Sequence, residues 1–541
     1  MNNKILPVLF LGLAGVFLSS CSKILDKTPT DFVEPQNYYN SESDLRFALA
    51  GVYDPLGSEY LYASSLWFQL GNCTDESFYP NSSNSFSAPM FYQFDYTNPY
   101  ISGLWQDCYK GIERANLLIE NIGKPVMDES KRQAILGEAL FLRAYYHFLL
   151  VSNFGTVLLK THSTTNVSTV DLPATPAKQV YEQVLQDMRE AEAKLEDAAT
   201  IGNSSHVSKT AAQATLARVC LYMAGNPLND KTRYAEALEW ARKVVVSGQH
   251  RLLEDFDERL TNSAYSQIFI NQAQDIYDIG ECMWEADFNM NQANTAFAEG
   301  GRLGTYQISC TNIDTGYGSG GVRTTISLYN LYGNGDLRRD WAIAPFTFQA
   351  SGSTLTRVPY TTANIINREC GKWRRYFEPT SFIRQQYRTG QNFPIVRYAD
   401  VLLMLAEADN EVNSGPTAEG YEALNQVRRR GYGVPVHAAD AAADAPGGLS
   451  QQDFRRFIME ERSRELCFEG LRKPDLIRWG VFYDVLTATA AEIQSSNASA
   501  TNKARWVLGY TTAISSPKYL LLPIPALEIN INKAIRQNPG W

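Results

Sequence analysis

The chain has 541 residues, of which 44% are hydrophobic and 20% charged, and its formal net charge is -9. This composition is typical of a globular protein long enough for one very large domain or several ordinary ones. An acidic chain lacks the basic surface that nucleic-acid binding requires, which argues against a nucleic-acid partner.

The first residues have the pattern of a bacterial lipoprotein signal. Lys4 supplies a positive charge, residues 5–18 are almost wholly apolar, and residues 18–21 (LSSC) have the small-residue pattern of a lipobox. The apolar run is too short to span a bilayer comfortably, and polar chain follows it. We therefore predict a signal peptide over residues 1–20 and a lipid on Cys21, and no further stretch long and apolar enough to cross a membrane. The alternative is an ordinary secretory signal that ends in a cysteine by chance.

A helical frame is expected after an extended tether. Residues 21–40, which include Pro29 and Pro35, predict a lipidated tether. Apolar residues then recur at helical spacing over 45–52, 104–119 and 135–149.

Helices are predicted to follow in antiparallel pairs. The pairs are 130–152 with 177–198, 208–225 with 232–247, and 396–413 with 417–430. They resemble tetratricopeptide helical pairs, which stack because no one pair can bury its own apolar face. The fold class predicted from this pattern is mainly α, with a tetratricopeptide-like scaffold.

A long insertion, about 250–393, separates the second pair from the third. It is rich in Gly, Asn, Gln, Thr and aromatic residues, and its alternating stretch 355–358 predicts a short strand. Further irregular stretches lie at 71–100 and 432–449. Because binding groups often sit in loops carried by a rigid frame, these loops are where we expect a ligand site.

Aromatic residues are unusually frequent. Tyrosine, phenylalanine and tryptophan make up 12% of the chain, and many fall in loop-like sequence. A flat ring can pack on the apolar face of a sugar while polar neighbours bond its hydroxyls, and the same groups can hold a peptide. We predict an exposed binding platform drawn from Trp67, Asp75, Tyr79, Phe91, Tyr92, Trp284, Tyr306, Tyr317 and Trp341.

Two motifs with enzymatic associations favour a structural interpretation. The G-x-G-x-x-G match at 316–321 does not follow a strand, so it predicts a flexible loop presenting Tyr306 and Tyr317 rather than a dinucleotide site. The carboxylate pairs Glu407 with Glu411 and Glu461 with Glu465 have the residue types of a glycosidase. They lie on helices beside arginines, which favours a charged face or an ion-pair network.

Cysteine and histidine usage predicts neither a disulfide framework nor a metal site. With Cys21 lipidated, seven scattered cysteines remain without a CxxC pair, and buried free thiols are expected. His147 stands among aromatic residues, as a packed core histidine does. We predict no cofactor and no metal ligands, although a loop could still hold a structural calcium ion.

The chain resembles the SusD/RagB family of nutrient-binding outer-membrane lipoproteins. The resemblance is carried by residues 394–408 (PIVRYADVLLMLAEA), 424–430 (LNQVRRR), 460–480 (EERSRELCFEGLRKPDLIRWG), 522–525 (LPIP), 537–541 (QNPGW), 141–148 (FLRAYYHF) and 154–155 (FG). Because these motifs are spread from residue 141 to the last residue, the resemblance extends over nearly the whole of the mature chain.

The resemblance implies that residues 41–541 form a single, mostly helical domain with a tetratricopeptide-like scaffold. It also implies that this domain is a non-catalytic lid on a SusC-like TonB-dependent transporter. Such a protein captures glycans, or peptides in some branches, and faces the cell exterior from the outer membrane. Arg397, Asp400, Glu461 and Arg464 then belong to the scaffold, and their helical face is a further candidate for contact with the barrel. The alternatives are a peptide-capturing RagB-like protein, a surface glycoside hydrolase and a scaffold that docks proteins.

Overall fold

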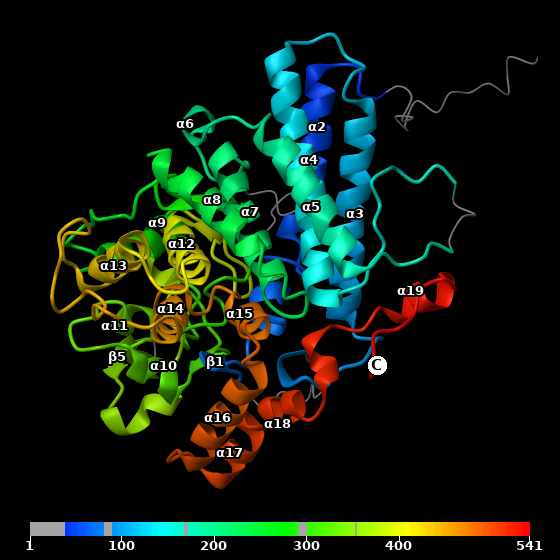
Figure 1. Cartoon of the computed structure of the whole chain (residues 1–541). Helices are drawn as coiled ribbons and strands as arrows, with labels where there is room; N and C mark the ends of the chain where they lie inside the picture. Colours follow the sequence, from blue (N-terminus) through cyan, green and yellow to red (C-terminus); the bar gives the residue numbers. More distant parts are fainter. Residues whose placement is uncertain (1–37, 81–88, 167–170, 290–299, 352–353) are drawn as a thin grey trace, which may run out of the picture.

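The computed structural model describes residues 38–80, 89–166, 171–289, 300–351 and 354–541 (Figure 1). The predicted signal peptide, Cys21 and most of the predicted tether lie outside these residues. The secondary structure is mainly helical, as the sequence predicts.

The N-terminal part is a bundle of long helices, which stand upright in Figure 1. They are α2 (Glu42–Tyr53), α3 (Pro99–Asn121), α4 (Glu129–Phe154) and α5 (Ala177–Glu192). The first begins in a capping box, in which the Ser41 hydroxyl accepts a hydrogen bond from the backbone N–H of Asp44 and the Asp44 carboxylate accepts one from that of Ser41. The helices α3 and α4 can pack closely, because Gly111 of α3 leaves room for the ring of Tyr146 of α4.

The helix α4 is long and apolar enough to cross a membrane, contrary to the prediction that no stretch after the signal would be. In the structure 83% of its apolar window is buried. Its neighbours α3 and α5 cover it, so its apolar character serves core packing.

The predicted helical pairs are confirmed and form one continuous series. The second pair is α7 (Lys209–Ala224) with α8 (Arg233–Val246), and the third is α12 (Tyr398–Val412) with α13 (Ala418–Tyr432). Each helix of the series packs on the next, in the order α4, α5, α7, α8, α12, α13. The second and third pairs therefore pack directly on one another, although the insertion separates them in sequence.

The insertion begins and ends at one place. The rings of His250 and Tyr398 lie 6.3 Å apart between centroids. The insertion contains the short helices α9 (Ala264–Ala273), α10 (Ile326–Leu331) and α11 (Arg339–Ala342). The short helix α6 (Ala198–Ile201) lies outside it, between α5 and α7. The insertion is thus a loop-rich segment whose two ends lie next to each other on the helical frame.

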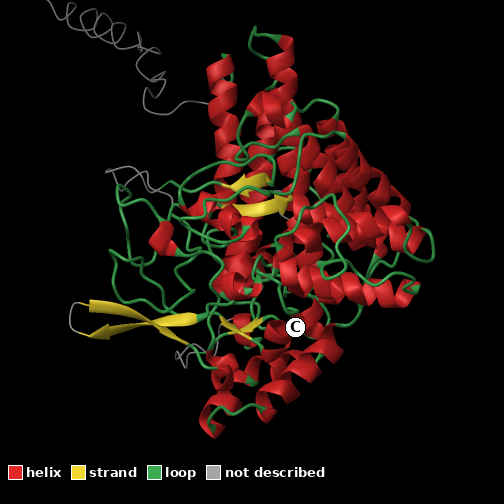
Figure 2. Ribbon diagram, turned by 90° about the vertical axis from the view of Figure 1, so that its left-hand side faces the viewer, coloured by secondary structure: helices red, strands yellow, loops and turns green. Residues whose placement is uncertain are grey.

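Short strands pair only in twos among the described residues. The sheets are β1 (Ser77–Phe78) with β3 (Arg323–Thr324), β2 (Cys282–Ala286) with β6 (Phe393–Arg397), and β4 (Phe346–Ser351) with β5 (Thr354–Pro359), all antiparallel. The last of these contains the predicted strand at 355–358 and projects from the body as a ribbon (Figure 2). The β2–β6 pair joins the end of the insertion to the start of α12 and is buried along its length.

The C-terminal helices carry a second hydrophobic cluster. They are α14 (Gln451–Leu466), α15 (Arg472–Trp479), α16 (Phe482–Ser495), α17 (Ala500–Trp506), α18 (Leu508–Ile514) and α19 (Ala526–Ile531). In this cluster Phe78 and Tyr92 pack with Trp506 and Tyr510. The loop around residue 78 is therefore packed against the C-terminal helices α17 and α18.

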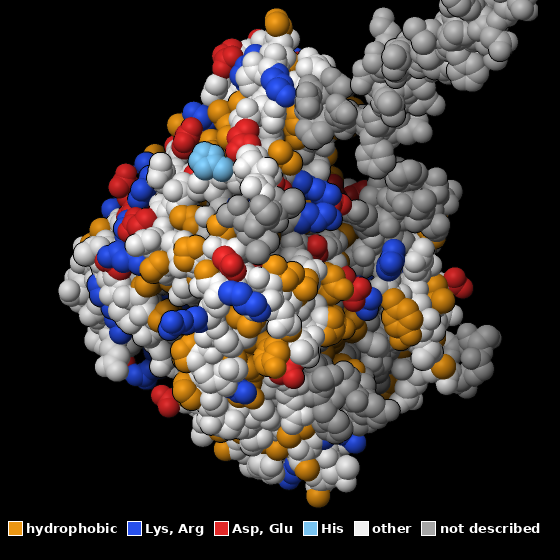
Figure 3. Space-filling view, turned by 90° about the vertical axis from the view of Figure 1, so that its right-hand side faces the viewer, with side chains coloured by type: hydrophobic (Ala, Val, Ile, Leu, Met, Phe, Trp, Pro, Cys, Tyr) orange, Lys and Arg blue, Asp and Glu red, His pale blue; other side chains and the backbone are white. Residues whose placement is uncertain are grey.

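Charges on the surface are mixed. On the face drawn in Figure 3, acidic and basic side chains are interspersed. The seven cysteines within the described ranges are free and buried, as predicted. His147 is also buried as predicted, and burial lowers its pKa to about 4.

Candidate functional site

Several aromatic residues predicted to line an exposed platform are buried instead. Trp284 is fully buried in β2, where its ring meets Phe141 and Tyr145 edge-on. Its strand is covered on both faces, which the sequence CMWEA does not distinguish from an exposed loop. The prediction that Trp284 is an exposed loop aromatic is therefore wrong.

The same correction applies to Trp67, Phe91, Tyr92 and Trp341, which are all buried. The indole of Trp67 donates a hydrogen bond to the backbone carbonyl of Tyr62, and that of Trp341 to the carbonyl of Lys372. Because these polar atoms are bonded within the fold, the rings act as core residues.

Asp75 is partly buried and is bonded to another residue of the protein. Its carboxylate accepts two hydrogen bonds from the guanidinium of Arg472, at 2.6 and 2.8 Å. This bidentate pair ties the loop at 71–80 to α15. Asp75 therefore has a structural partner.

Three of the predicted aromatic residues, Tyr79, Tyr306 and Tyr317, are only partly buried. Tyr306 stacks on Phe68 with ring centroids 3.7 Å apart and planes 6° from parallel. A Cβ atom at Gly321 would lie 3.3 Å from the ring of Tyr306 and 3.4 Å from that of Tyr79. This glycine, from the G-x-G-x-x-G stretch, thus lies between two tyrosine rings, and Tyr306 is packed in place rather than carried on a flexible loop.

Arg302 joins Tyr306 to further tyrosines. Its guanidinium donates a hydrogen bond to the Tyr306 hydroxyl at 2.9 Å and forms an ion pair with Glu59 at 2.9 Å. Burial, followed by the charges of Glu59 and Tyr306, raises the pKa of Tyr100, while the guanidinium of Arg302 opposes that shift. The ring of Tyr60 lies 6.4 Å from that of Tyr100.

Tyr317 extends the same group toward Tyr387. Their ring centroids are 5.3 Å apart, edge to face, and Tyr387 is 52% exposed. A hydrogen bond with Tyr317 raises the pKa of Tyr387, and Tyr306 adds to the shift. We call Tyr60, Tyr79, Tyr100, Tyr306, Tyr317 and Tyr387, with Arg302 and Glu59, the tyrosine surface.

The tyrosine surface combines flat apolar rings with hydroxyl, guanidinium and carboxylate groups. Such a set can pack against a ligand ring and bond hydroxyls around it, and it contains no nucleophile paired with a base. Sequence reasoning missed Tyr60, Tyr100, Arg302 and Tyr387. The first two adjoin helices and look like core residues, and nothing in the sequence indicates that residues near 60, 100, 302 and 387 meet.

The carboxylate pairs belong to ion-pair networks, as the sequence favoured. Glu407 binds the guanidinium of Arg478 through both oxygens, and Glu411 pairs with Arg455. Glu461 lies 2.7 Å from Arg338, and Glu465 lies 3.0 Å from Arg397. All the members except Glu411 and Arg455 are buried.

Burial also decides the role of the motif residues on the frame. Arg397, Asp400, Glu461 and Arg464 are all buried and paired with opposite charges. They hold α12 and α14 together, so these side chains are not exposed for contact with a partner. Within the described ranges, no group of three or more His, Cys, Asp or Glu side chains is placed to hold a metal ion.

Comparison with known proteins assigns the family. A family model described as "SusD family" matches residues 346–541, and one described as "Starch-binding associating with outer membrane" matches residues 23–221. The chain is a member of the SusD/RagB family. SusD-like proteins of this kind are carbohydrate-binding and associated with the outer membrane.

The similarity to individual SusD-like proteins extends over the whole chain. SusD-like protein P2 of Formosa agariphila is 26% identical, with 99% of this chain and 98% of that protein aligned. A crystal structure of a SusD homolog from Bacteroides thetaiotaomicron is 29% identical with a TM-score of 0.84, covering 94% of this chain and 98% of that one. A structure described as a laminarin-binding SusD-like protein shares the fold at 23% identity and a TM-score of 0.67, covering 93% of this chain and all of the other.

Proposed function

We propose that this SusD-like chain captures oligosaccharides on the tyrosine surface without cleaving them and passes them to a SusC-like TonB-dependent transporter. The observation that carries the proposal is the meeting of Tyr306, Tyr100 and Arg302 at a partly exposed surface. Flat rings beside a fixed guanidinium suit a ligand that presents apolar ring faces and hydroxyl edges. The family description and the laminarin-binding relative support the same ligand class.

Packing within the tyrosine surface favours binding in a fixed geometry. Tyr306 is stacked on Phe68 and bonded through its hydroxyl, so its orientation is set before a ligand arrives. A surface that is already ordered loses less conformational entropy on binding. Tyr317 and Tyr387, at the more exposed end, can adjust to ligands of different shape.

The carboxylate pairs identified in the sequence are not arranged for hydrolysis of a glycosidic bond. A glycosidase needs two carboxyl groups facing each other across a cleft, about 5–10 Å apart. Glu407, Glu461 and Glu465 are buried and bonded to arginines, so they do not meet this requirement. We therefore propose a binding protein rather than an enzyme.

A lipid on Cys21 would hold the protein at the outer membrane, facing the cell exterior. Each buried lipid methylene contributes about 0.8 kcal/mol, so several acyl chains can retain a globular domain. A tether raises the local concentration of the domain at the transporter. A Cys21→Ala form should bind ligand normally but support uptake poorly, and full uptake by that form would contradict the role of the tether.

The ligand class can be tested by calorimetry on the purified mature chain. Glycan panels that include maltohexaose and laminarihexaose should yield at least one neutral oligosaccharide that binds, without release of reducing ends. The variant Tyr317→Ala/Tyr387→Ala should weaken that binding by about tenfold, or about 1.4 kcal/mol. Phe47→Ala, which removes an exposed ring on α2, is the matched control and should bind normally.

Three results would each contradict a part of the proposal. Binding of peptides with no response to any glycan would favour the RagB-like alternative of peptide capture. Turnover of the bound oligosaccharide would favour a hydrolase. Unchanged binding in the double tyrosine variant would move the glycan site away from the tyrosine surface.

A further inference from the structure

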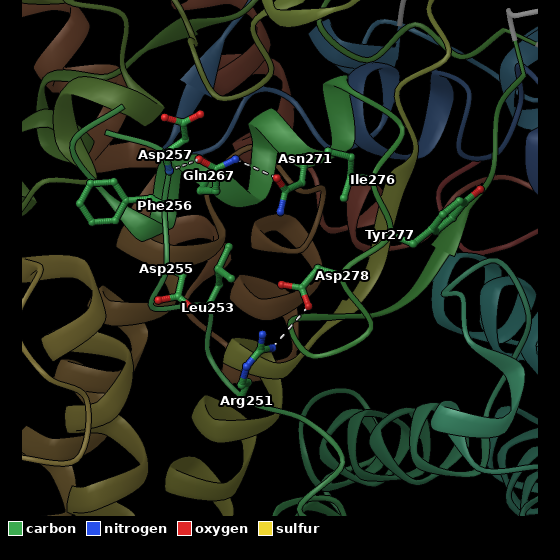
Figure 4. Close-up of a pocket in the computed structure, with 10 residues that line it drawn as sticks. All are labelled: Arg251, Leu253, Asp255, Phe256, Asp257, Gln267, Asn271, Ile276, Tyr277 and Asp278. Atoms are coloured by element: carbon green, nitrogen blue, oxygen red, sulfur yellow. Dashed lines mark hydrogen bonds and ion pairs between the residues drawn. The ribbon is translucent and has the colours of Figure 1, made fainter. Parts of the chain in front are cut away.

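A second candidate site is an open groove on the insertion, which shares no residue with the tyrosine surface. It has a volume of about 500 Å³ and lies between the chain at 251–257, the helix α9 and the chain at 276–278 (Figure 4). This volume is in the range of small-molecule sites, about 300–1,000 Å³. No motif in the sequence pointed to it.

Asn271 presents a hydrogen-bond donor to this groove. Its side-chain oxygen accepts a hydrogen bond from the Gln267 amide at 2.8 Å, and the Gln267 oxygen in turn accepts one from the backbone of Asp257 at 3.0 Å. These two bonds fix which end of the Asn271 amide faces outward. Figure 4 shows its nitrogen directed toward the space between Leu253 and Asp278.

Asp278 and Arg251 face Asn271 across the groove. One carboxylate oxygen of Asp278 accepts hydrogen bonds from the backbone of Gly280 at 3.0 Å and from Arg251 at 3.4 Å. Its other oxygen accepts no hydrogen bond from the residues that the structure describes, although it is shielded from solvent. A shielded acceptor without a donor carries an energetic cost. The Asp278 side chain as a whole is 17% exposed and lines the groove, so a ligand hydroxyl can donate to its accessible part.

Apolar side chains complete the groove. Leu253 is buried, while Phe256 and Ile276 are 37% and 51% exposed at its rim. Tyr277 is held through its hydroxyl by Asn392 and Asp287. The groove therefore offers an exposed ring and an aliphatic side chain on either side of a donor, an acceptor and a guanidinium.

We propose that this groove is a second carbohydrate site, which takes one neutral pyranose ring. The ring would lie against Phe256 and Ile276, its hydroxyls donating to Asp278 and accepting from Asn271 and Arg251. The site can act whether or not the tyrosine surface binds glycans, and where both bind, one long chain could engage both.

Charge favours a neutral sugar over a basic peptide. Arg251 pairs with Asp278, and Arg259 pairs with Asp257 at 2.6 Å. The carboxylates of the groove are thus largely compensated within the protein, with Asp255 as the exception on the rim. A site for a lysine or arginine side chain would leave its carboxylates free for that cation.

Saturation-transfer NMR on the mature chain can test the groove directly. The probes are the methyl pyranosides of glucose, galactose, mannose and xylose, offered to the Tyr317→Ala/Tyr387→Ala variant so that the groove is observed apart from those tyrosines. At least one pyranoside should receive saturation. Asn271→Asp, which keeps the oxygen that Gln267 bonds but removes the donor, should reduce that signal about tenfold, and Phe256→Ala should do the same.

The outcomes separate the two proposals. Signals that Asn271→Asp and Phe256→Ala leave unchanged, or no signal from any pyranoside, would overturn the groove site, whatever the tyrosine variants do to oligosaccharide binding. A lysine-containing tripeptide that binds more tightly to Asn271→Asp than to the parent would show a cation site instead. Phe47→Ala is again the control for an exposed ring elsewhere, and thermal denaturation shows that each variant is folded.

Discussion

Gly103 of α3 lies directly beneath the ring of Tyr60. A Cβ atom at Gly103 would stand 2.2 Å from that ring, nearer than atoms can approach. The position of Tyr60 on the tyrosine surface thus depends on the absence of a side chain at residue 103.

Gly103→Ala should therefore displace Tyr60. We expect oligosaccharide affinity to fall about fivefold, or about 1 kcal/mol, and unfolding free energy to fall by about 1–3 kcal/mol through overpacking. Calorimetry and chemical denaturation measure the two effects. Gly51→Ala on α2, where an added Cβ meets nothing within 4 Å, is the control and should leave binding unchanged. Equal affinities for the parent and Gly103→Ala would show that Tyr60 does not contact the ligand.

Arg302→Gln should weaken ligand binding more than it weakens the fold. The change removes the hydrogen bond to Tyr306 and the ion pair with Glu59. Because that pair is partly exposed, we expect a stability loss of at most about 1 kcal/mol, and an affinity loss of about tenfold. Arg46→Gln, which breaks an exposed pair with Glu42, controls for the lost charge. A proportionate loss of stability and affinity would make Arg302 a structural residue only.

Glu465→Gln should severely destabilise the frame. Its carboxylate lies within 3.1 Å of Arg338, Arg397 and Arg430, all fully buried. Burial by itself would raise the pKa of Glu465, but the arginines lower it overall. Removing one partner from a buried network leaves uncompensated charge and costs about 3–5 kcal/mol.

The matched control for Glu465 is Glu460→Gln, which changes a glutamate on the exposed side of the same helix, α14. Glu460 lies 3.6 Å from Arg464 and is 40% exposed, so its loss should cost about 0–1 kcal/mol. Denaturation midpoints compare the two variants. Similar midpoints would mean that the buried network contributes no more than a surface pair.

Glu285→Gln should become relatively more stabilising as pH rises. Burial without a cationic partner raises the pKa of Glu285 from 4.5 to about 7. The folded state therefore holds a proton that the unfolded state loses, so the wild-type fold is favoured by this group below pH 4.5 and loses that contribution as pH rises to about 7. The full contribution is about 3 kcal/mol, at about 1.4 kcal/mol per pKa unit.

Glutamine cannot ionise, so the difference in unfolding free energy between Glu285→Gln and the wild type should grow from pH 4.5 to 7 and then level off. Denaturation series across this range measure it. Glu239→Gln, an exposed residue of α8, should show no comparable trend. A flat difference for Glu285→Gln would mean that Glu285 stays ionised in the fold.

Local periodicity was sufficient to predict the helical frame. The apolar faces of α4, α7 and α12 repeat at helical spacing, and the structure places helices there. The arginine-rich context of Glu461 and Glu465 also predicted ion pairing correctly. Their partner Arg338, however, lies more than 120 residues away, and no local pattern indicates it.

The tyrosine surface could be predicted only in part. Trp284 and Trp341 look like loop residues, yet they lie buried in the short strand β2 and the short helix α11. Tyr306 and Tyr317 were chosen from loop composition, and the structure leaves them partly exposed. Arg302 and Tyr387 were missed because the surface forms only when distant segments fold onto the frame.

The closeness of His250 to Tyr398 bears on how such proteins diversify. Because the insertion starts and finishes at one point of the frame, the entropy of closing it depends only on the logarithm of its length. Doubling the number of residues costs about 0.6 kcal/mol, which is comparable to the effect of a single surface substitution, usually within about 0.5 kcal/mol. The exposed turns of the insertion can therefore change in length at little cost in stability, while the helical stack that carries them keeps its packing.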